Sequence, residues 1–159
     1  MSVLFIILVG GYTRIKNAGL SMTYWKPLSI KFPKNEEEWS KEYEEYKNFA
    51  EYKINKTGLK EFKFIFFMEY FHRMLARSMG LVFVLPLIYF NCRGYIKSRL
   101  NKVLIKVGLL GGLQAVIGWW MVKSGLEKKH DYQIRPKVST YRLITHLSIA
   151  ITIYSTLLW

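Results

Sequence analysis

The sequence predicts an all-α membrane protein built as a four-helix transmembrane bundle. Of its 159 residues 51% are hydrophobic, yet the formal net charge is +13. The hydrophobic residues gather in long runs, and most of the charges lie in the connectors between these runs. A run of about 20 mostly apolar residues is long enough to cross a bilayer as a helix. A soluble basic domain would instead spread its charges through amphipathic elements.

Three complete membrane spans and one partial span are expected. The complete spans are residues 64–90, 103–122 and 141–159. Residues 1–11 are also apolar, but as a helix they are only about 16 Å long, which is about half of a hydrocarbon core. We therefore expect the first transmembrane helix to be truncated, with the chain beginning inside it.

The first connection, residues 12–63, is long and is expected to form an outer loop with a helix of its own. Asn35 precedes three glutamates, which is typical of a helix start. Trp39, Tyr43 and Tyr46 then recur at helical spacing, which predicts a short amphipathic helix that lies on the membrane surface or caps the bundle. The alternative is a solvated helix held only by salt links.

Charge predicts the orientation of the spans. The short connector 91–102 carries four basic residues and no acidic one, so it should stay on the negative side of the membrane. Residues 12–63 and 123–140 should face the opposite compartment. Because no nucleic-acid-binding fold is recognisable, the basic charge indicates a lipid bilayer as partner and not nucleic acid. The single cysteine, Cys92, excludes an internal disulfide.

The span 64–90 is unusual because it contains charged residues. An ionisable side chain inside a membrane span indicates a functional site, since its burial costs a few kcal/mol. At about 100° per residue these groups lie on one side of the helix or at its edge, together with the small residues Ala76 and Gly80. A flat, bulky ligand such as haem fits beside such small residues. The ionisable residues are Glu69, His72, Arg73 and Arg77.

A second histidine, His146, lies in the last span. Both histidine-bearing helices should enter from the same side, with His72 roughly 12 Å and His146 roughly 9 Å below the entry points, at about 1.5 Å per residue. Two imidazoles at matching depth can face each other, and haem iron accepts histidine as an axial ligand. The alternative for both histidines is an interhelical hydrogen bond. Gln114, in the third run, has either a functional role or a structural one, in which a single interhelical hydrogen bond satisfies it.

Several sequence blocks, in order along nearly the whole chain, resemble the heme A synthase family. Taken together they are specific to it, although each alone is weak. The blocks are Gly10-Gly11-Tyr12-Thr13-Arg14, Gly19-Leu20-Ser21-Met22, Trp25-Lys26-Pro27, Glu51-Tyr52, Glu61-Phe62-Lys63-Phe64-Ile65, Glu69-Tyr70-Phe71-His72-Arg73, Gln114, Gly118-Trp119-Trp120-Met121-Val122-Lys123-Ser124-Gly125-Leu126, and Val138-Ser139-Thr140-Tyr141-Arg142-Leu143 with His146.

The resemblance implies an eight-helix, pseudo-symmetric fold made of two four-helix halves, each with a histidine pair around a haem. Residues 1–159 are similar to the N-terminal half alone, as a fragment or a split subunit. In the family this half oxidises the C8 methyl group of heme O to a formyl group, which makes heme A for cytochrome c oxidase. The missing second half would hold a heme b.

The resemblance also implies roles for individual residues. His72 and His146 would be the axial ligands, and Glu69 would be the essential acidic residue beside the reacting edge of heme O. Glu69 lies one turn from His72 on the same face, and a carboxyl group suits proton transfer. The alternative for Glu69 is an internal ion pair. Four arginines would hold haem propionates or, alternatively, anchor helix ends: Arg14, Arg73, Arg77 and Arg142.

Two other functions remain open from the sequence: a non-catalytic bis-histidine b-type cytochrome or haem-carrying module, and a purely structural bundle. The partners implied are heme O, the missing C-terminal half or a second copy of the chain, heme O synthase and an electron donor. The outer loop lacks the cysteine pair of some bacterial members. A multi-pass location in the mitochondrial inner membrane is therefore expected, with the bacterial plasma membrane as the alternative.

Overall fold

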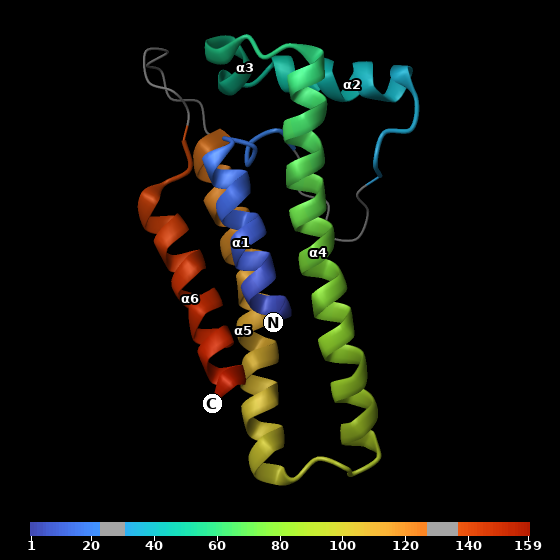
Figure 1. Ribbon diagram of the computed structural model, residues 1–159, viewed down its shortest axis with the longest axis vertical. Helices are drawn as coiled ribbons and strands as arrows, with labels where there is room; N and C mark the ends of the chain where they lie inside the picture. Colours follow the sequence, from blue (N-terminus) through green and yellow to red (C-terminus); the bar gives the residue numbers. More distant parts are fainter. Residues whose placement is uncertain (23–30, 127–136) are drawn as a thin grey trace.

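A computed structural model describes residues 1–22, 31–126 and 137–159 (Figure 1). These three stretches contain helices and no strand. The helices are α1 (Ser2–Ile15), α2 (Glu36–Lys47), α3 (Ala50–Asn55), α4 (Leu59–Cys92), α5 (Ser98–Leu126) and α6 (Thr140–Leu158). The all-α prediction is confirmed for the described part of the chain.

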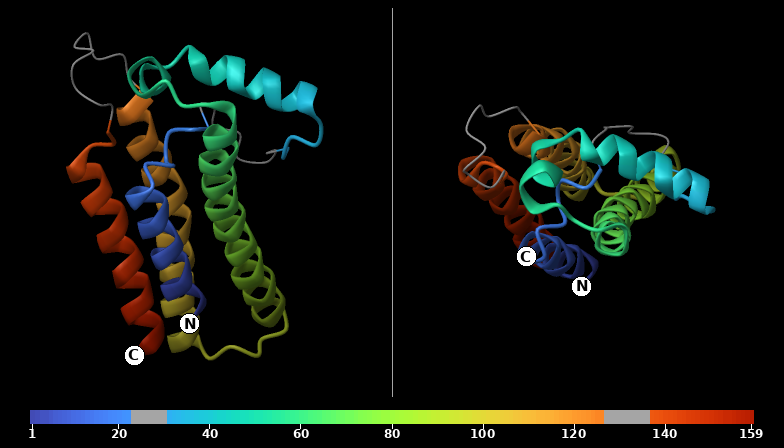
Figure 2. Two further views of the ribbon diagram at one scale, coloured as in Figure 1. Left: turned by 45° about the horizontal axis from the view of Figure 1, so that its top comes forward. Right: turned by 90° about the horizontal axis from the view of Figure 1, so that it is seen from above.

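The four apolar helices α1, α4, α5 and α6 run side by side, as both views in Figure 2 show. α1 contacts α4 and α6, and α5 contacts the same two helices. α2 and α3 lie across one end, whereas the turn between α4 and α5 lies at the other end (Figure 1). The two connectors that were predicted to face opposite compartments, 12–63 and 91–102, therefore do lie at opposite ends.

Two of the described helices, α4 and α5, are long and apolar enough to cross a membrane. With 34 and 29 residues they are about 51 Å and 44 Å long, so both extend beyond the predicted spans 64–90 and 103–122. Large apolar side chains on them point outward, for example Val82, which is 74% exposed, and Leu109, which is 71% exposed. Such exposure is typical of a surface that lies against lipid.

The other two apolar helices are shorter. α6 matches the predicted span 141–159 closely, and α1 continues past residue 11 to Ile15. Because α1 has 14 residues, it is about 21 Å long and covers only part of α4. The face of α4 beyond α1 is open, and Ala76 and Gly80 on it are exposed. That these two small residues lie beside a bound ligand stays a prediction.

The helix predicted after Asn35 is confirmed as α2. The Asn35 Oδ1 atom accepts a hydrogen bond of 2.8 Å from the backbone N–H of Glu38, which is the usual N-cap arrangement. Trp39 and Tyr46 on α2 are buried, so α2 caps the bundle, and the alternative of a helix held only by salt links is wrong. The short helix α3 was not predicted.

The buried core lies under this cap and is mainly aromatic. Phe62 and Phe66, from the first turns of α4, are fully buried. The ring centroid of Phe62 lies 4.8 Å from that of Tyr46, and the Phe66 ring meets Trp39 edge-on at 5.3 Å. Tilted and edge-to-face pairs add to the energy of burial. The end of α4 nearest the cap is therefore held by α2, and this fixes the start of the helix that carries His72.

Phe62→Ala is expected to destabilise the cap by about 3–5 kcal/mol, because it removes a buried ring and leaves a cavity. Phe64→Ala is the matched control, since Phe64 is on the same helix but is 46% exposed. Hydrogen exchange of the α2 and α3 amides in lipid nanodiscs measures the difference. Equal protection in the two variants would contradict this position of the core.

The opposite ends of the structure should be reached from opposite sides of a membrane. Cys92 is exposed at the end of α4, and Glu45 is exposed on α2 in the cap. An impermeant maleimide added to sealed vesicles should label Cys92 from one side only. In a Cys92→Ser background, Glu45→Cys should be labelled only from the other side. Labelling of both positions from the same side would rule out the transmembrane arrangement.

Candidate functional site

Glu69 is a buried carboxylate in α4, and it is only 4% exposed. Its Oε2 atom accepts hydrogen bonds from the Ser21 backbone N–H at 2.9 Å, the Ser21 hydroxyl at 2.7 Å and the Met22 N–H at 2.9 Å. Its Oε1 atom accepts one from the Arg73 guanidinium. With four donors, one of them charged, the carboxylate is fully hydrogen-bonded inside the protein.

The ion pair between Glu69 and Arg73, which was the alternative reading of Glu69, is present in the structure. The Arg73 guanidinium also approaches the Met22 carbonyl oxygen, at 3.4 Å. On the other side of the same segment, Leu20 packs against Gly125 of α5, where a Cβ atom would lie only 2.6 Å from a Leu20 methyl group. The segment from Ala18 to Met22 is therefore held between α4 and α5.

His72 lies one turn after Glu69 and packs against α1. A Cβ atom added to Gly10 would lie 3.0 Å from the Nε2 atom of His72. This is tighter than most real Cβ contacts, so a larger residue here would push the imidazole away by a few tenths of an ångström. The adjacent Gly11 has open space around it. The close contact is thus specific to the glycine that faces the histidine.

His146, on α6, has a similar neighbour on α5. A Cβ atom at Gly118 would lie 3.3 Å from the Cε1 atom of the imidazole. The Gln114 side-chain amide donates a 2.9 Å hydrogen bond to the backbone carbonyl of His146, so one of the two readings of Gln114, the interhelical hydrogen bond, is confirmed. The Nδ1 atom of His146 is buried and has no hydrogen-bond partner among the described residues.

The two histidines lie near each other in the bundle. Their helices, α4 and α6, both contact α1, and the imidazoles are close enough for a charge on His72 to act on His146. The structure therefore brings His72 and His146 into one region, next to the Glu69 and Arg73 pair on α4. Whether they bind haem iron stays a prediction.

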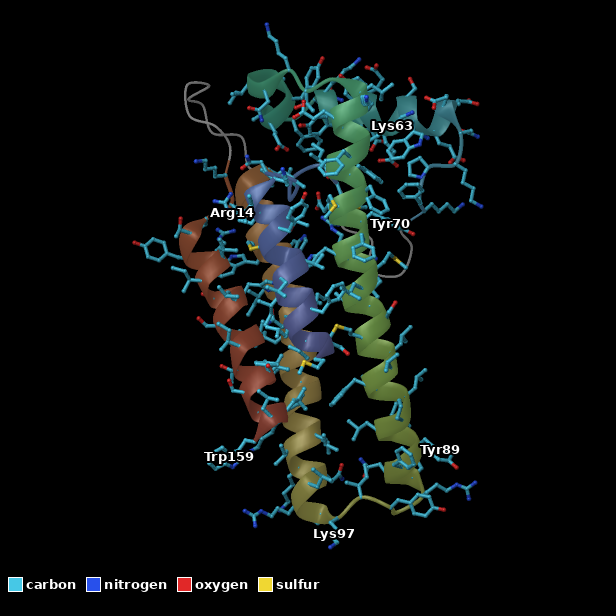
Figure 3. All side chains as sticks on the ribbon, in the orientation of Figure 1. Arg14, Lys63, Tyr70, Tyr89, Lys97 and Trp159 are labelled. Carbon is cyan, nitrogen blue, oxygen red and sulfur yellow. The ribbon has the colours of Figure 1, made fainter. Side chains whose placement is uncertain are left out.

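The remaining arginines, Arg14, Arg77 and Arg142, lie on three different helices, α1, α4 and α6. Arg142 stacks over the ring of Trp120, 4.5 Å from its centroid, and donates a 2.7 Å hydrogen bond to the Trp120 carbonyl, which supports the helix-anchoring alternative for this residue. Arg77 contacts the sulfur of Met74 at 3.6 Å. Arg14 lies at the cap end of α1 (Figure 3). A propionate-binding role for these arginines stays a prediction.

Sequence reasoning assigned no role to Glu51, which is the second residue of α3. This side chain is only 5% exposed, and burial, followed by the nearby charge of Glu69, raises its pKa to about 8. In the sequence it looks like one more glutamate of a polar loop. The only signal is its place in a block shared with the heme A synthase family, beside Tyr52.

The described part of the chain contains no group of three or more His, Cys, Asp or Glu side chains that could hold a metal ion.

The sequence was compared with known proteins. The pattern of the COX15-CtaA family, described as "Cytochrome oxidase assembly protein", matches residues 1–159. A protein named heme A synthase COX15 from Arabidopsis thaliana is 48% identical over 97% of this chain, which is 34% of that protein. The protein of the same name from Saccharomyces cerevisiae is 44% identical over 97% of this chain and 33% of its own length.

Bacterial proteins match equally well. Heme A synthase from Allorhizobium ampelinum is 45% identical over 97% of this chain and 42% of its own length. No solved structure matches the chain. The chain thus spans between a third and somewhat under half of the length of these curated relatives. Since the family pattern covers all of its residues, the chain belongs to the COX15-CtaA family of cytochrome oxidase assembly proteins.

Proposed function

We propose that this chain forms the haem-oxidising part of a heme A synthase, in which α1, α4, α5 and α6 make a transmembrane four-helix bundle around heme O. One observation carries the proposal: His72 on α4 and His146 on α6 lie near each other, each against a helical glycine. The names of the relatives support the same activity. A second, similar half would complete an eight-helix protein with a heme b.

The residues present fit a porphyrin. A porphyrin supplies most of the iron ligands itself, and the imidazoles of His72 and His146 would provide those that the protein contributes. The buried Nδ1 atom of His146, which has no described partner, is a polar group in need of an explanation. Beside His72, the exposed Ala76 and the open space around Gly80 leave room for a large planar ligand.

In this proposal the chain binds heme O as substrate, orients it and handles protons at its edge. His72 and His146 would hold the iron, and the C8 methyl group would become a formyl group through hydroxylation steps and loss of water, with an oxidant and the electron donor supplied from outside the chain. Forming the formyl group includes loss of water from a hydroxylated carbon, which requires proton transfer at oxygen. Glu69, one turn from His72, is the carboxyl group proposed to carry out this transfer.

The binding of the propionates and the partners also belong to the proposal. Guanidinium groups suit paired carboxylate contacts, and Arg14, Arg73, Arg77 and Arg142 all lie on the bundle helices. The proposed partners are a complementing second half or a second copy of the chain, heme O synthase and an electron donor. The proposed location is the mitochondrial inner membrane, with the bacterial plasma membrane as the alternative, since relatives of both kinds match.

A second candidate is a non-catalytic bis-histidine cytochrome. It is favoured by the hydrogen bonding of Glu69, whose two oxygens already accept four hydrogen bonds from Ser21, Met22 and Arg73. A carboxylate used in this way can serve to hold the segment before α2 and take no part in a reaction. The two candidates differ in whether heme A is formed.

Replacing either proposed ligand is expected to remove the bound haem. His72→Ala and His146→Ala should each abolish the low-spin spectrum of bis-imidazole haem, because one axial bond is lost. The chain is purified after co-expression with heme O synthase and the complementing portion of a relative, and the extracted haems are separated chromatographically. Heme A in the unaltered protein, and its loss in both variants, is the expected result.

Glu69→Gln separates the two candidates in the same assay. If Glu69 transfers protons, the variant keeps its haem but accumulates heme O, with turnover lower by about 100-fold or more. An unchanged ratio of heme A to heme O would contradict a catalytic role for Glu69. Heme O or heme b alone in the unaltered, complemented protein would establish the cytochrome instead.

The glycine against His72 gives a sharper test because Gly11 is a matched control next to it. Gly10→Ala should displace the imidazole and cost about 1–3 kcal/mol of haem affinity, where each 1.4 kcal/mol is about tenfold. Gly11→Ala meets open space and should leave affinity unchanged while stabilising α1 by about 0.5–1 kcal/mol. Haem titration followed by absorbance measures both. Equal affinities would show that the Gly10 contact does not matter.

A further inference from the structure

The buried carboxyl group of Glu51 has no part in the site as described so far. It lies in the cap, on α3, with its Oε2 atom buried and without a hydrogen-bond partner among the described residues. Buried polar atoms are nearly always hydrogen-bonded, because leaving one unpaired costs about 1–3 kcal/mol. A leucine or methionine would fill the same space without that cost. The carboxyl group itself therefore needs an explanation.

Two titratable groups from neighbouring elements face Glu51. The Tyr46 hydroxyl comes from α2, and it also lies 3.4 Å from the Thr57 hydroxyl. The carboxylate of Glu69 comes from α4, and its negative charge acts on Glu51. The Tyr46 hydroxyl favours the charged form of Glu51, but burial and the charge of Glu69 outweigh it. Glu51 is therefore protonated at neutral pH.

The two carboxyl groups have opposite environments. Glu69 accepts four hydrogen bonds, one of them from Arg73, and so has the surroundings of a carboxylate. Glu51 is buried without a cation against it in the described structure. The negative charge of Glu69 disfavours ionisation of Glu51. Glu51 is therefore the carboxyl group that carries a proton, and the Arg73 guanidinium pairs with Glu69.

We propose that Glu51 is a proton-carrying residue that serves Glu69 from the cap side. The proposal rests on the proposed function, because it assigns a source for the protons that Glu69 transfers. In the forward step the Glu51 carboxylic acid gives its proton to the Glu69 carboxylate. Glu51 becomes the carboxylate, Glu69 becomes the acid, and the total charge of the pair stays at −1.

The position of α3 sets the direction of the proton transfer from Glu51 to Glu69, which we call the relay. α2 and α3 lie across the end of the bundle (Figure 2), and Glu51 belongs to α3, whereas Glu69 belongs to α4. Glu69 then gives this proton to the hydroxyl group that leaves as water, and the proton of the remaining hydroxyl group passes to solvent as the formyl group forms. The Glu51 carboxylate regains a proton from water on the cap side, which returns the pair to its starting state. Only protons move in this cycle. The electrons for the oxidation of heme O are not carried by these two residues.

Glu51→Gln tests the relay, because glutamine keeps the size of the side chain and carries no acidic proton. Glu45→Gln, which changes an exposed carboxyl group on α2, is the matched control. The first readout is infrared spectroscopy of the complemented protein between about pH 6 and 10, over the pKa of about 8. A protonated-carboxyl band that disappears as the pH rises should be present in the unaltered protein and in the Glu45→Gln variant, and absent in the Glu51→Gln variant.

The second readout is the ratio of heme A to heme O as a function of pH. In the unaltered protein heme A formation should fall as the pH rises through about 8, because Glu51 then loses its proton. Glu51→Gln should lower heme A formation by at least about tenfold and remove this dependence on pH. A merely structural Glu51 would leave the shape of the profile unchanged.

Three results would overturn the inference. One is the absence of any carboxyl band that titrates near pH 8 in the unaltered protein, which needs no variant and therefore holds even if Glu51→Gln fails to fold. Another is a Glu51→Gln variant with the pH profile of the unaltered protein. The third, an unaltered protein that shows the band but makes no heme A, refutes the proposed function and removes the relay's purpose, and it is distinguishable from the first two.

Discussion

The rest of the structure depends on one buried carboxylate, Glu69, and the four hydrogen bonds that it accepts. Hydrogen bonds to charged groups contribute about 1.5–3 kcal/mol each, and an unpaired buried charge costs several. The carboxylate therefore needs its donors, and these come from Arg73 on α4 and from the backbone and side chain of residues 21 and 22. This requirement fastens the chain after α1 to the middle of α4. The same hydrogen bonds fix the depth in the bundle at which His72, one turn after Glu69, packs against α1.

Around this anchor the two histidines are placed by small residues. Gly10 and Gly118 come from α1 and α5, and each leaves the space that an imidazole on the neighbouring helix occupies. Helices in lipid associate through close packing and hydrogen bonds and not through the hydrophobic effect. Glycine at a contact therefore sets how near two helices come, and the Gln114 hydrogen bond to the carbonyl of His146 fixes α5 against α6. The polar groups of the site thus lie in the same layer as the closest helix contacts.

The sequence predicted the apolar helices, the helix after Asn35 and the region shared by Glu69, His72 and Arg73, because each depends on local spacing and on the cost of charge in lipid. Other features depend on contacts between distant segments. The four donors to Glu69 include Ser21 and Met22, which are more than 40 residues away, and no periodicity indicates this contact. Glu51 looks like an ordinary loop glutamate in the sequence, but it is buried in the structure, where it belongs to α3. Ala76 and Gly80 are exposed in the described chain, and what lies against them also depends on contacts that local spacing does not reveal.

The length of α4 has a consequence for the membrane around it. From Lys63 (labelled in Figure 3) to Cys92, just before Arg93, the helix spans 30 residues, or about 45 Å, close to the full thickness of a bilayer with its headgroups. Charged residues at both ends of α4 are costly to bury in the hydrocarbon core, so a thinner bilayer would be accommodated by tilting of this helix. Because the cap is packed on its first turns, α2 and α3 would tilt with it. The thickness of the bilayer would therefore set the tilt of α2 and α3 relative to the membrane surface.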